Sequence, residues 1–165
     1  MRYIITIIIL VVLISVSSCD RKDFNTIPSS GKLQFSKDTV YLDTVFTNIG
    51  SATYNLKVYN RGNNAITIPR IQLENGNNSN YRLNVDGIPG KDFTNIDILE
   101  KDSIFIFIET TINAGNILDP LYTDKILFGS GDTQQNVDLV TLVQDANFIF
   151  PGRDGVTMKI DSLTL

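Results

Sequence analysis

The sequence contains no histidine and no tryptophan, and its 165 residues include a single cysteine. Without histidine, the chain can form neither a Ser-His-Asp or Cys-His catalytic site nor a His-ligated metal site. The single cysteine excludes an intramolecular disulfide. The formal charge of −4 disfavours nucleic acid as a partner. Because no catalytic motif is visible either, we expect a non-enzymatic protein without catalytic residues, cofactor or metal.

The first 18 residues have the organisation of an export signal. Arg2 supplies a positive charge, and residues 4–16 form an apolar run. This run is shorter than the roughly 20 residues that a membrane-spanning helix needs. It ends in Val16-Ser17-Ser18-Cys19, which resembles the lipobox of bacterial lipoproteins. The resemblance implies that Cys19 becomes the acylated N-terminal residue, whereas the alternative is an ordinary signal peptide with an incidental cysteine.

The residues after Cys19 bear on where the protein is located. The charged stretch Asp20-Arg21-Lys22-Asp23-Phe24 resembles the surface-export signals of Bacteroidetes lipoproteins. In other Gram-negative groups, Asp directly after the cysteine is instead a retention signal for the inner membrane, and the charges could also simply solvate a tether. We expect the protein to be located in the cell envelope, at the outer membrane rather than at the inner membrane. Either side of the outer membrane is compatible with the sequence. The polar composition predicts a tether over residues 19–30.

Residues 31–147 have the pattern of one all-β domain. Short apolar segments are separated by Asn, Gly and Asp, and no segment sustains a helical period. The apolar residues lie at even positions before Pro69 (Ile66, Ile68) and at odd positions after it (Ile71, Leu73). This change predicts a bulge, a bend or an edge position at Pro69. Expected strands cover residues 33–35, 40–46, 54–60, 66–73 with the change at Pro69, 81–85, 103–111, 125–128 and 137–143. Seven or eight strands at this spacing predict an antiparallel, immunoglobulin-like β-sandwich.

Three short motifs carry a family resemblance. Ile49-Gly50-Ser51 precedes a strand that ends at Asn60-Arg61-Gly62, and Asp102-Ser103 opens a long apolar strand. The pattern resembles immunoglobulin-like modules related to the ASPM-SPD-2-Hydin group, which implies an immunoglobulin-like fold. The whole stretch to about Phe150 is similar to the N-terminal region of a class of Bacteroidetes cell-surface lipoproteins. In that class a right-handed β-helix often follows, so residues 148–165 are interpreted as a tail or as the start of such a domain.

Four tripeptides resemble the Asp-(Ser/Thr)-aliphatic acceptor of the Bacteroidetes O-glycosylation system. They would place a glycan on Thr39, Thr44, Ser103 or Ser162. The alternative is that Asp-Thr and Asp-Ser simply begin strands after turns.

Acidic and aromatic residues supply two further candidate sites. Asp119, Asp124, Asp132 and Asp154 are expected in loops, but no spaced calcium loop is present, so we interpret them as solvated turn residues. A glycan-binding surface would need aromatic rings in an exposed row. The available rings are Tyr41, Tyr54, Tyr59, Tyr81 and Tyr122.

The segment from Ser103 to Glu109 has two apolar faces. Ile104, Ile106 and Ile108 alternate with Phe105 and Phe107, whereas only one face of a strand meets the core of a sandwich. The β-branched isoleucines suit the core, so we expect both phenylalanines to point outward and to contact a partner. The cover could come from residues 148–150, from a following domain or from a second copy of the chain.

These observations favour a lipid-anchored cell-envelope module that acts as a spacer or interaction domain of a surface protein. Its expected partners are the membrane, through the anchor, and a protein or glycan at the cell surface. The alternatives are a glycan-binding module and an accessory domain of an envelope polysaccharide-degrading enzyme.

We predict that Cys19→Ala abolishes membrane anchoring, because Cys19 closes the apolar run and is the only cysteine in the chain. The variant should be released from the membrane fraction or remain unprocessed, as measured by fractionation and intact mass. Lipidation at Cys19 is wrong if the variant matures and partitions like the wild type.

Overall fold

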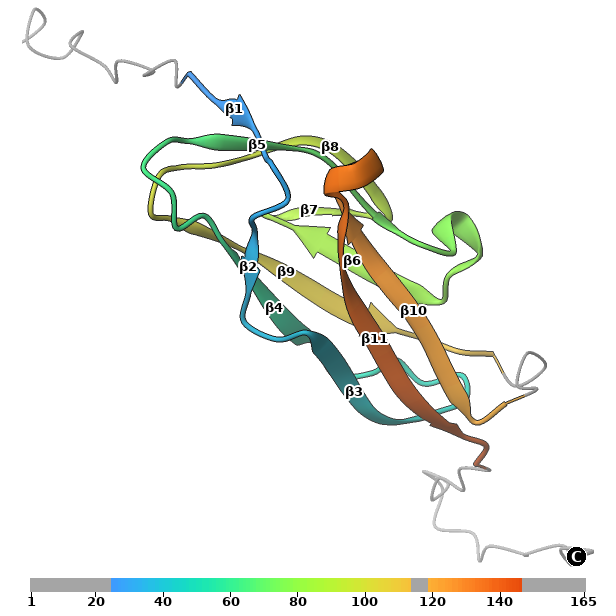
Figure 1. Ribbon diagram of the computed structural model, residues 1–165. Coiled ribbons are helices and arrows are strands. Elements are labelled where there is room, and N and C mark those ends of the chain that lie inside the picture. The colour runs from blue at the N-terminus through green and yellow to red at the C-terminus, as the bar shows by residue number, and fades with distance from the viewer. Residues whose placement is uncertain (1–24, 114–118, 147–165) are drawn as a thin grey trace, which may run out of the picture.

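The computed structural model describes residues 25–113 and 119–146, and these residues form an all-β sandwich (Figure 1). The expected β-sandwich is confirmed, although these residues form eleven strands rather than the expected seven or eight, and eight of the strands are five residues or longer. The strands are β1 (Ile27–Pro28), β2 (Gln34–Phe35), β3 (Thr39–Phe46), β4 (Tyr54–Tyr59), β5 (Ile66–Leu73), β6 (Tyr81–Val85), β7 (Ile88–Gly90), β8 (Asp92–Ile98), β9 (Ser103–Thr110), β10 (Leu121–Phe128) and β11 (Gln135–Gln144).

The strands divide between two sheets. In the six-stranded sheet, β5, β10, β11 and β3 are successive neighbours, while β1 and β8 both pair with β5. The five-stranded sheet has the order β2, β4, β9, β6, β7. The expectation of purely antiparallel pairing is corrected at two places, since β1 runs parallel to β5 and β3 runs parallel to β11. The parallel β3–β11 pair joins the first long strand to the last.

Pro69 marks a change of face within β5, as the sequence predicted. Ile68 and Ile71 are both fully buried although they lie three positions apart. The neighbouring strand β8, which the sequence analysis did not predict, is irregular at the same position. Its Asn95 has a positive φ of 55° and lies between Ile96, which pairs with Ile68, and Thr94, which pairs with Arg70. Proline cannot donate to the ladder and Asn tolerates left-handed backbone, so the two strands switch faces together.

The core lies between the sheets and follows the alternation of the strands. Ile106 and Ile108 of β9 are fully buried and belong to the same hydrophobic cluster as Ile126 and Leu139 of the other sheet. At one end of the core, the Tyr81 hydroxyl donates to the Tyr122 carbonyl oxygen at 3.1 Å and lies 2.8 Å from Thr141 Oγ1. Burial raises the pKa of Tyr81 far above its usual range, although the Thr141 hydrogen bond opposes the shift. This polar contact joins β6 to the opposite sheet.

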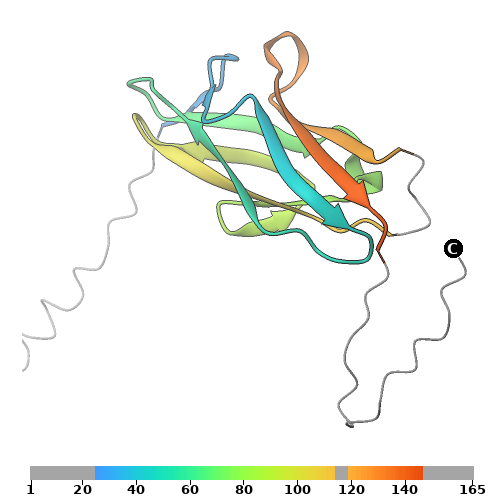
Figure 2. The same ribbon diagram turned by 90° about the horizontal axis from the view of Figure 1, so that it is seen from below.

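Strand pairing begins earlier in the chain than the composition indicated. Ile27 and Pro28, which the sequence assigned to the tether, pair with Ile66 and Thr67 of β5. Leu33 is only 7% exposed and belongs to the core. The start of β1 and the end of β11 lie at opposite ends of the sandwich (Figures 1 and 2). The chain therefore enters the described domain at one end and leaves it at the other.

Asn60 connects the loop after β4 to the end of β8. Its side chain is buried, and its Nδ2 donates to the carbonyl oxygens of Asn64 at 2.8 Å, Leu99 at 2.9 Å and Ile98 at 3.2 Å. Its Oδ1 accepts from the backbone N–H of Gly62 at 3.0 Å. The Asn-x-Gly motif seen in the sequence is thus a loop clamp, with the asparagine satisfying four backbone groups.

We predict that Asn60→Asp lowers the free energy of unfolding by about 3 kcal/mol, because it places a buried carboxylate against three carbonyl oxygens. Urea unfolding measures the change. Asn63→Asp is the matched control, because Asn63 lies in the same loop and is exposed. Equal losses in the two variants would show that the clamp has no particular importance.

Candidate functional site

The outer face of β4 and β9 carries a cluster that we call the aromatic face, made of Lys57, Tyr59, Arg61, Phe105 and Phe107. Phe105 and Phe107 are 44% and 42% exposed, and their ring centroids lie 6.2 Å apart with the planes inclined by 15°. The neighbouring isoleucines of β9 point into the core. The predicted outward orientation of both rings is confirmed, while their contact with a partner stays a prediction.

Two cations belong to the aromatic face, Lys57 on β4 and Arg61 in the loop that follows β4. Lys57 Nζ lies 5.0 Å from the ring centroid of Phe105 and 5.3 Å from that of Tyr59. The guanidinium carbon of Arg61 lies 4.2 Å from the Tyr59 centroid. Cations at these distances are attracted by the ring faces. The sequence analysis missed both cations, although Lys57 and Tyr59 share the outward parity of β4, because the β4–β9 register decides which side chains meet.

Polar side chains flank the same face near β6. Asn55 and Asn84 pair with Phe107 from its two sides in the sheet. Asn84 lines a small pocket of about 180 Å³ together with Phe107 and Glu109, and its buried Oδ1 has no hydrogen-bond partner in the described part of the chain. Arg82 lies 3.6 Å from the Glu109 carboxylate, so the charges at this end offset one another.

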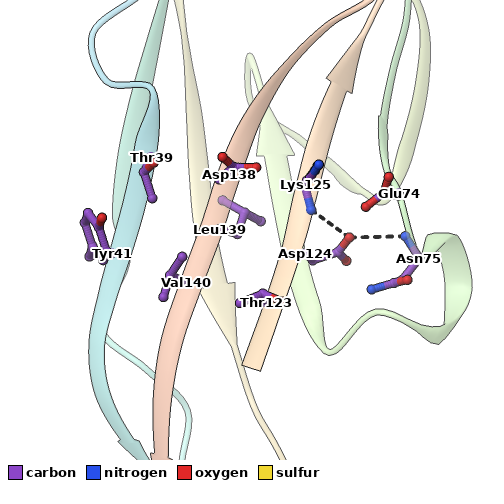
Figure 3. A pocket seen from close by; sticks show the side chains of 10 residues that line it. All are labelled: Thr39, Tyr41, Glu74, Asn75, Thr123, Asp124, Lys125, Asp138, Leu139 and Val140. Carbon is purple, nitrogen blue, oxygen red and sulfur yellow. Dashed lines mark hydrogen bonds between the residues drawn. The ribbon is translucent and has the colours of Figure 1, made fainter. Parts of the chain in front are cut away.

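The opposite sheet carries a second candidate surface, a hollow of about 690 Å³ that we call the polar depression (Figure 3). It lies across β3, β11 and β10 and reaches the segment that follows β5. Its lining residues are Thr39, Tyr41, Glu74, Asn75, Thr123, Asp124, Lys125, Asp138, Leu139 and Val140. Three carboxylates and one ammonium group therefore line a surface to which Tyr41, 68% exposed, contributes a ring.

Asp124 corrects one expectation of the sequence analysis. It lies within β10 rather than in a loop, and it is 4% exposed. Its Oδ1 accepts from the backbone N–H groups of Lys125 at 2.7 Å and Asn75 at 3.2 Å (Figure 3). Asp124 thus holds the segment after β5 against β10, whereas Asp119 accepts from the N–H of Leu121 in a turn. Across residues 25–113 and 119–146, no three potential ligands come together to hold a metal ion.

The tyrosines do not form the row that a glycan-binding surface would need. Tyr81 is buried, and Tyr54 and Tyr122 pack against the core. Tyr41 and Tyr59 lie on the outer faces of opposite sheets. The exposed aromatic surface of the described domain is instead built mainly from phenylalanine.

The proposed glycan acceptors lie at strand starts or at a bulge. Thr39 and Ser103 open β3 and β9, and Ser103 N–H donates to Asp102 Oδ1 at 2.7 Å. Thr44 follows Asp43, whose φ of 50° accompanies a register shift between β3 and β11. These contacts support the turn interpretation, and glycosylation stays a prediction. Ser162, Asp154, Cys19 and the aromatic tail at 148–150 lie outside the described residues.

Comparisons with known proteins give weak similarities of fold. No family model and no curated protein matches the chain. A family 123 glycoside hydrolase from Clostridium perfringens aligns with a TM-score of 0.48 and 10% identity, over 69% of this chain but 27% of the hydrolase. A FixG-related protein from Vibrio parahaemolyticus aligns at 0.39 and 12% over 59% of this chain and 81% of its own length. The periplasmic chaperone SfaE aligns at 0.39 and 14% over 72% and 59%. Similarity at this level carries no functional argument.

The described residues contain no helix that is long and apolar enough to cross a membrane.

We predict that Phe107→Ser lowers the free energy of unfolding by about 1 kcal/mol, whereas Ile106→Ser lowers it by about 4 kcal/mol, because only the isoleucine lies in the core. Chemical denaturation of the two variants measures the difference. An equally large loss for Phe107→Ser would mean that another part of the same chain covers the ring.

Proposed function

We propose that this protein is a lipid-anchored, non-enzymatic module of the bacterial cell envelope that acts as a spacer and as an interaction domain. The aromatic face is the observation that carries the contact role. Two adjacent rings with more than two-fifths of their surface exposed exceed the isolated apolar side chain that needs no explanation. Neighbouring cations add a charge preference to that surface.

The positions of the chain ends support the spacer role. Because β1 and the end of β11 lie at opposite ends of the sandwich, the domain adds its own length between whatever precedes and follows it (Figure 1). If Cys19 is the anchor, pairing of Ile27 with β5 leaves a tether that reaches about 26 Å when fully extended. The domain would then stand close to its membrane.

The backbone of both outer strands of the larger sheet is irregular. This irregularity favours binding of a partner to the face of the sheet over pairing of a partner's strand with the sheet edge. β3 is interrupted by the left-handed backbone of Asp43, and β8 is interrupted by Asn95. Irregularities of this kind protect an exposed strand from pairing with another chain. The outer face of this sheet is therefore better suited to a partner than its edges are.

The glycan-binding alternative rests on one observation, the row Asn55–Phe107–Asn84 across three strands. A ring with an amide on either side could stack on a sugar and bond to its hydroxyl groups. The glycan-binding alternative uses the same aromatic face as the protein-binding role. One measurement of how accessible this face is in the envelope therefore tests both.

We predict that a thiol placed on the aromatic face is shielded in the envelope. Asn55→Cys introduces an exposed thiol beside Phe107, and lipidation of Cys19 would leave it as the only free one. A small maleimide should label this variant at least tenfold more slowly in isolated envelopes than after extraction and dilution. Thr94→Cys, exposed on β8, is the control and should react equally in both preparations.

Equal labelling of Asn55→Cys before and after extraction would contradict the interaction role. Shielding that disappears when envelope polysaccharide is digested, with protein contacts left intact, would select the glycan-binding alternative.

A further inference from the structure

We infer that the partner of the aromatic face is the polar depression of a second copy of this chain. The inference rests on the proposed contact role of Phe105 and Phe107 and specifies what they contact. Its support comes from the charges, the apolar groups and the placement of the two surfaces on the described domain.

The two surfaces carry charges of opposite sign. Lys57 and Arg61 lie over the rings of the aromatic face, although the protein as a whole has a net charge of −4. The polar depression contains Glu74 and Asp138, with Lys125 as its only cation. Complementary potentials of this kind favour and orient encounter between two surfaces.

The same charges disfavour symmetric pairing. Two aromatic faces placed together would bring into contact two surfaces that both carry Lys57 and Arg61. Two depressions placed together would bring into contact two surfaces in which the carboxylates outnumber the single ammonium group. Juxtaposed like charges oppose association, so contact between the two different surfaces is the arrangement that the charges favour.

The depression also offers apolar contact for the two rings. Tyr41 is 68% exposed at its margin, and Val140 lies beside it on β11 (Figure 3). Leu121 and Leu142 form a cross-strand pair in the adjoining part of the same sheet and are 51% and 41% exposed. Phe105 and Phe107 would remove this apolar surface from water, which drives association in proportion to the area buried.

The placement of the surfaces predicts how copies assemble. The aromatic face and the depression belong to different sheets, and each lies on the outside of the sandwich. A contact between two different surfaces on opposite sides of the sandwich leaves one unused surface on each outer molecule, so further copies add to form an open row. Copies related mainly by translation keep their N-terminal ends on the same side, which suits proteins that are anchored in one membrane.

The experiment uses the mature chain with Cys19→Ala, so that acyl chains do not cause clustering. The aromatic-face variant is Phe105→Ser with Phe107→Ser, and the depression variant is Tyr41→Ser with Asp138→Asn. Leu99→Ser removes an exposed apolar side chain outside both surfaces and serves as the control. Circular dichroism confirms that each variant is folded before sedimentation is measured.

We predict that the wild type forms a concentration-dependent series of oligomers, with a Kd on the order of 10 to 100 μM that rises with salt. The control should behave like the wild type. Each double variant alone should associate at least tenfold more weakly. An equimolar mixture of the two variants should form a dimer and nothing larger, because one intact aromatic face and one intact depression remain between them.

The outcomes separate this inference from the proposed function. If only the aromatic-face variant loses association, the contact is symmetric and the inference is wrong, while the contact role stands. If the wild type stays monomeric but Asn55→Cys is shielded in envelopes, the aromatic face binds a different partner and the inference is again wrong. If the wild type is monomeric and Asn55→Cys is unshielded, both proposals fail.

Discussion

Burial of the three isoleucines of β9 is the interaction on which the surfaces of this domain depend. Ile104, Ile106 and Ile108 face the opposite sheet and are 7% exposed or less. Side chains alternate between the two faces of a strand, so this burial forces Phe105 and Phe107 outward. The antiparallel register then sets Lys57 opposite Phe105. The aromatic face follows from the core, because shifting β9 by one residue would expose the isoleucines.

The opposite sheet obeys the same rule with one exception. Ile126 and Phe128 of β10 point inward, which leaves Lys125 on the outer face beside Asp138. Asp124 has the inward parity but lies where β5 has turned away, and there it bonds to the backbone of the departing segment. The polar depression therefore forms where the sheet narrows and a loop takes the place of a strand. Its shape depends on that buried carboxylate.

The two outer faces of the sandwich differ in charge, so the two sides of the domain are not equivalent. The described chain also enters at one end of the sandwich and leaves at the other, so the two ends are not equivalent either (Figure 1). The irregular outer strands of the larger sheet leave its outer face as the surface more open to contact. In the proposed role of an envelope spacer, a domain with these features would organise neighbouring molecules as well as separate what lies at its two ends.

The sequence by itself determined the all-β class, most of the long strands, the change of face at Pro69 and the outward orientation of Phe105, because alternation is a local property of the pleated chain. The tertiary structure decided the rest. The sequence did not predict β8 because Asn95 interrupts its alternation of apolar and polar residues. It did not predict β1 because this strand has only two residues and forms only by pairing with β5. The companions of Phe105, the burial of Asp124 and the dispersal of the tyrosines likewise depend on which distant strands become neighbours. Long-range pairing leaves no period in the sequence, so only the folded chain reveals it.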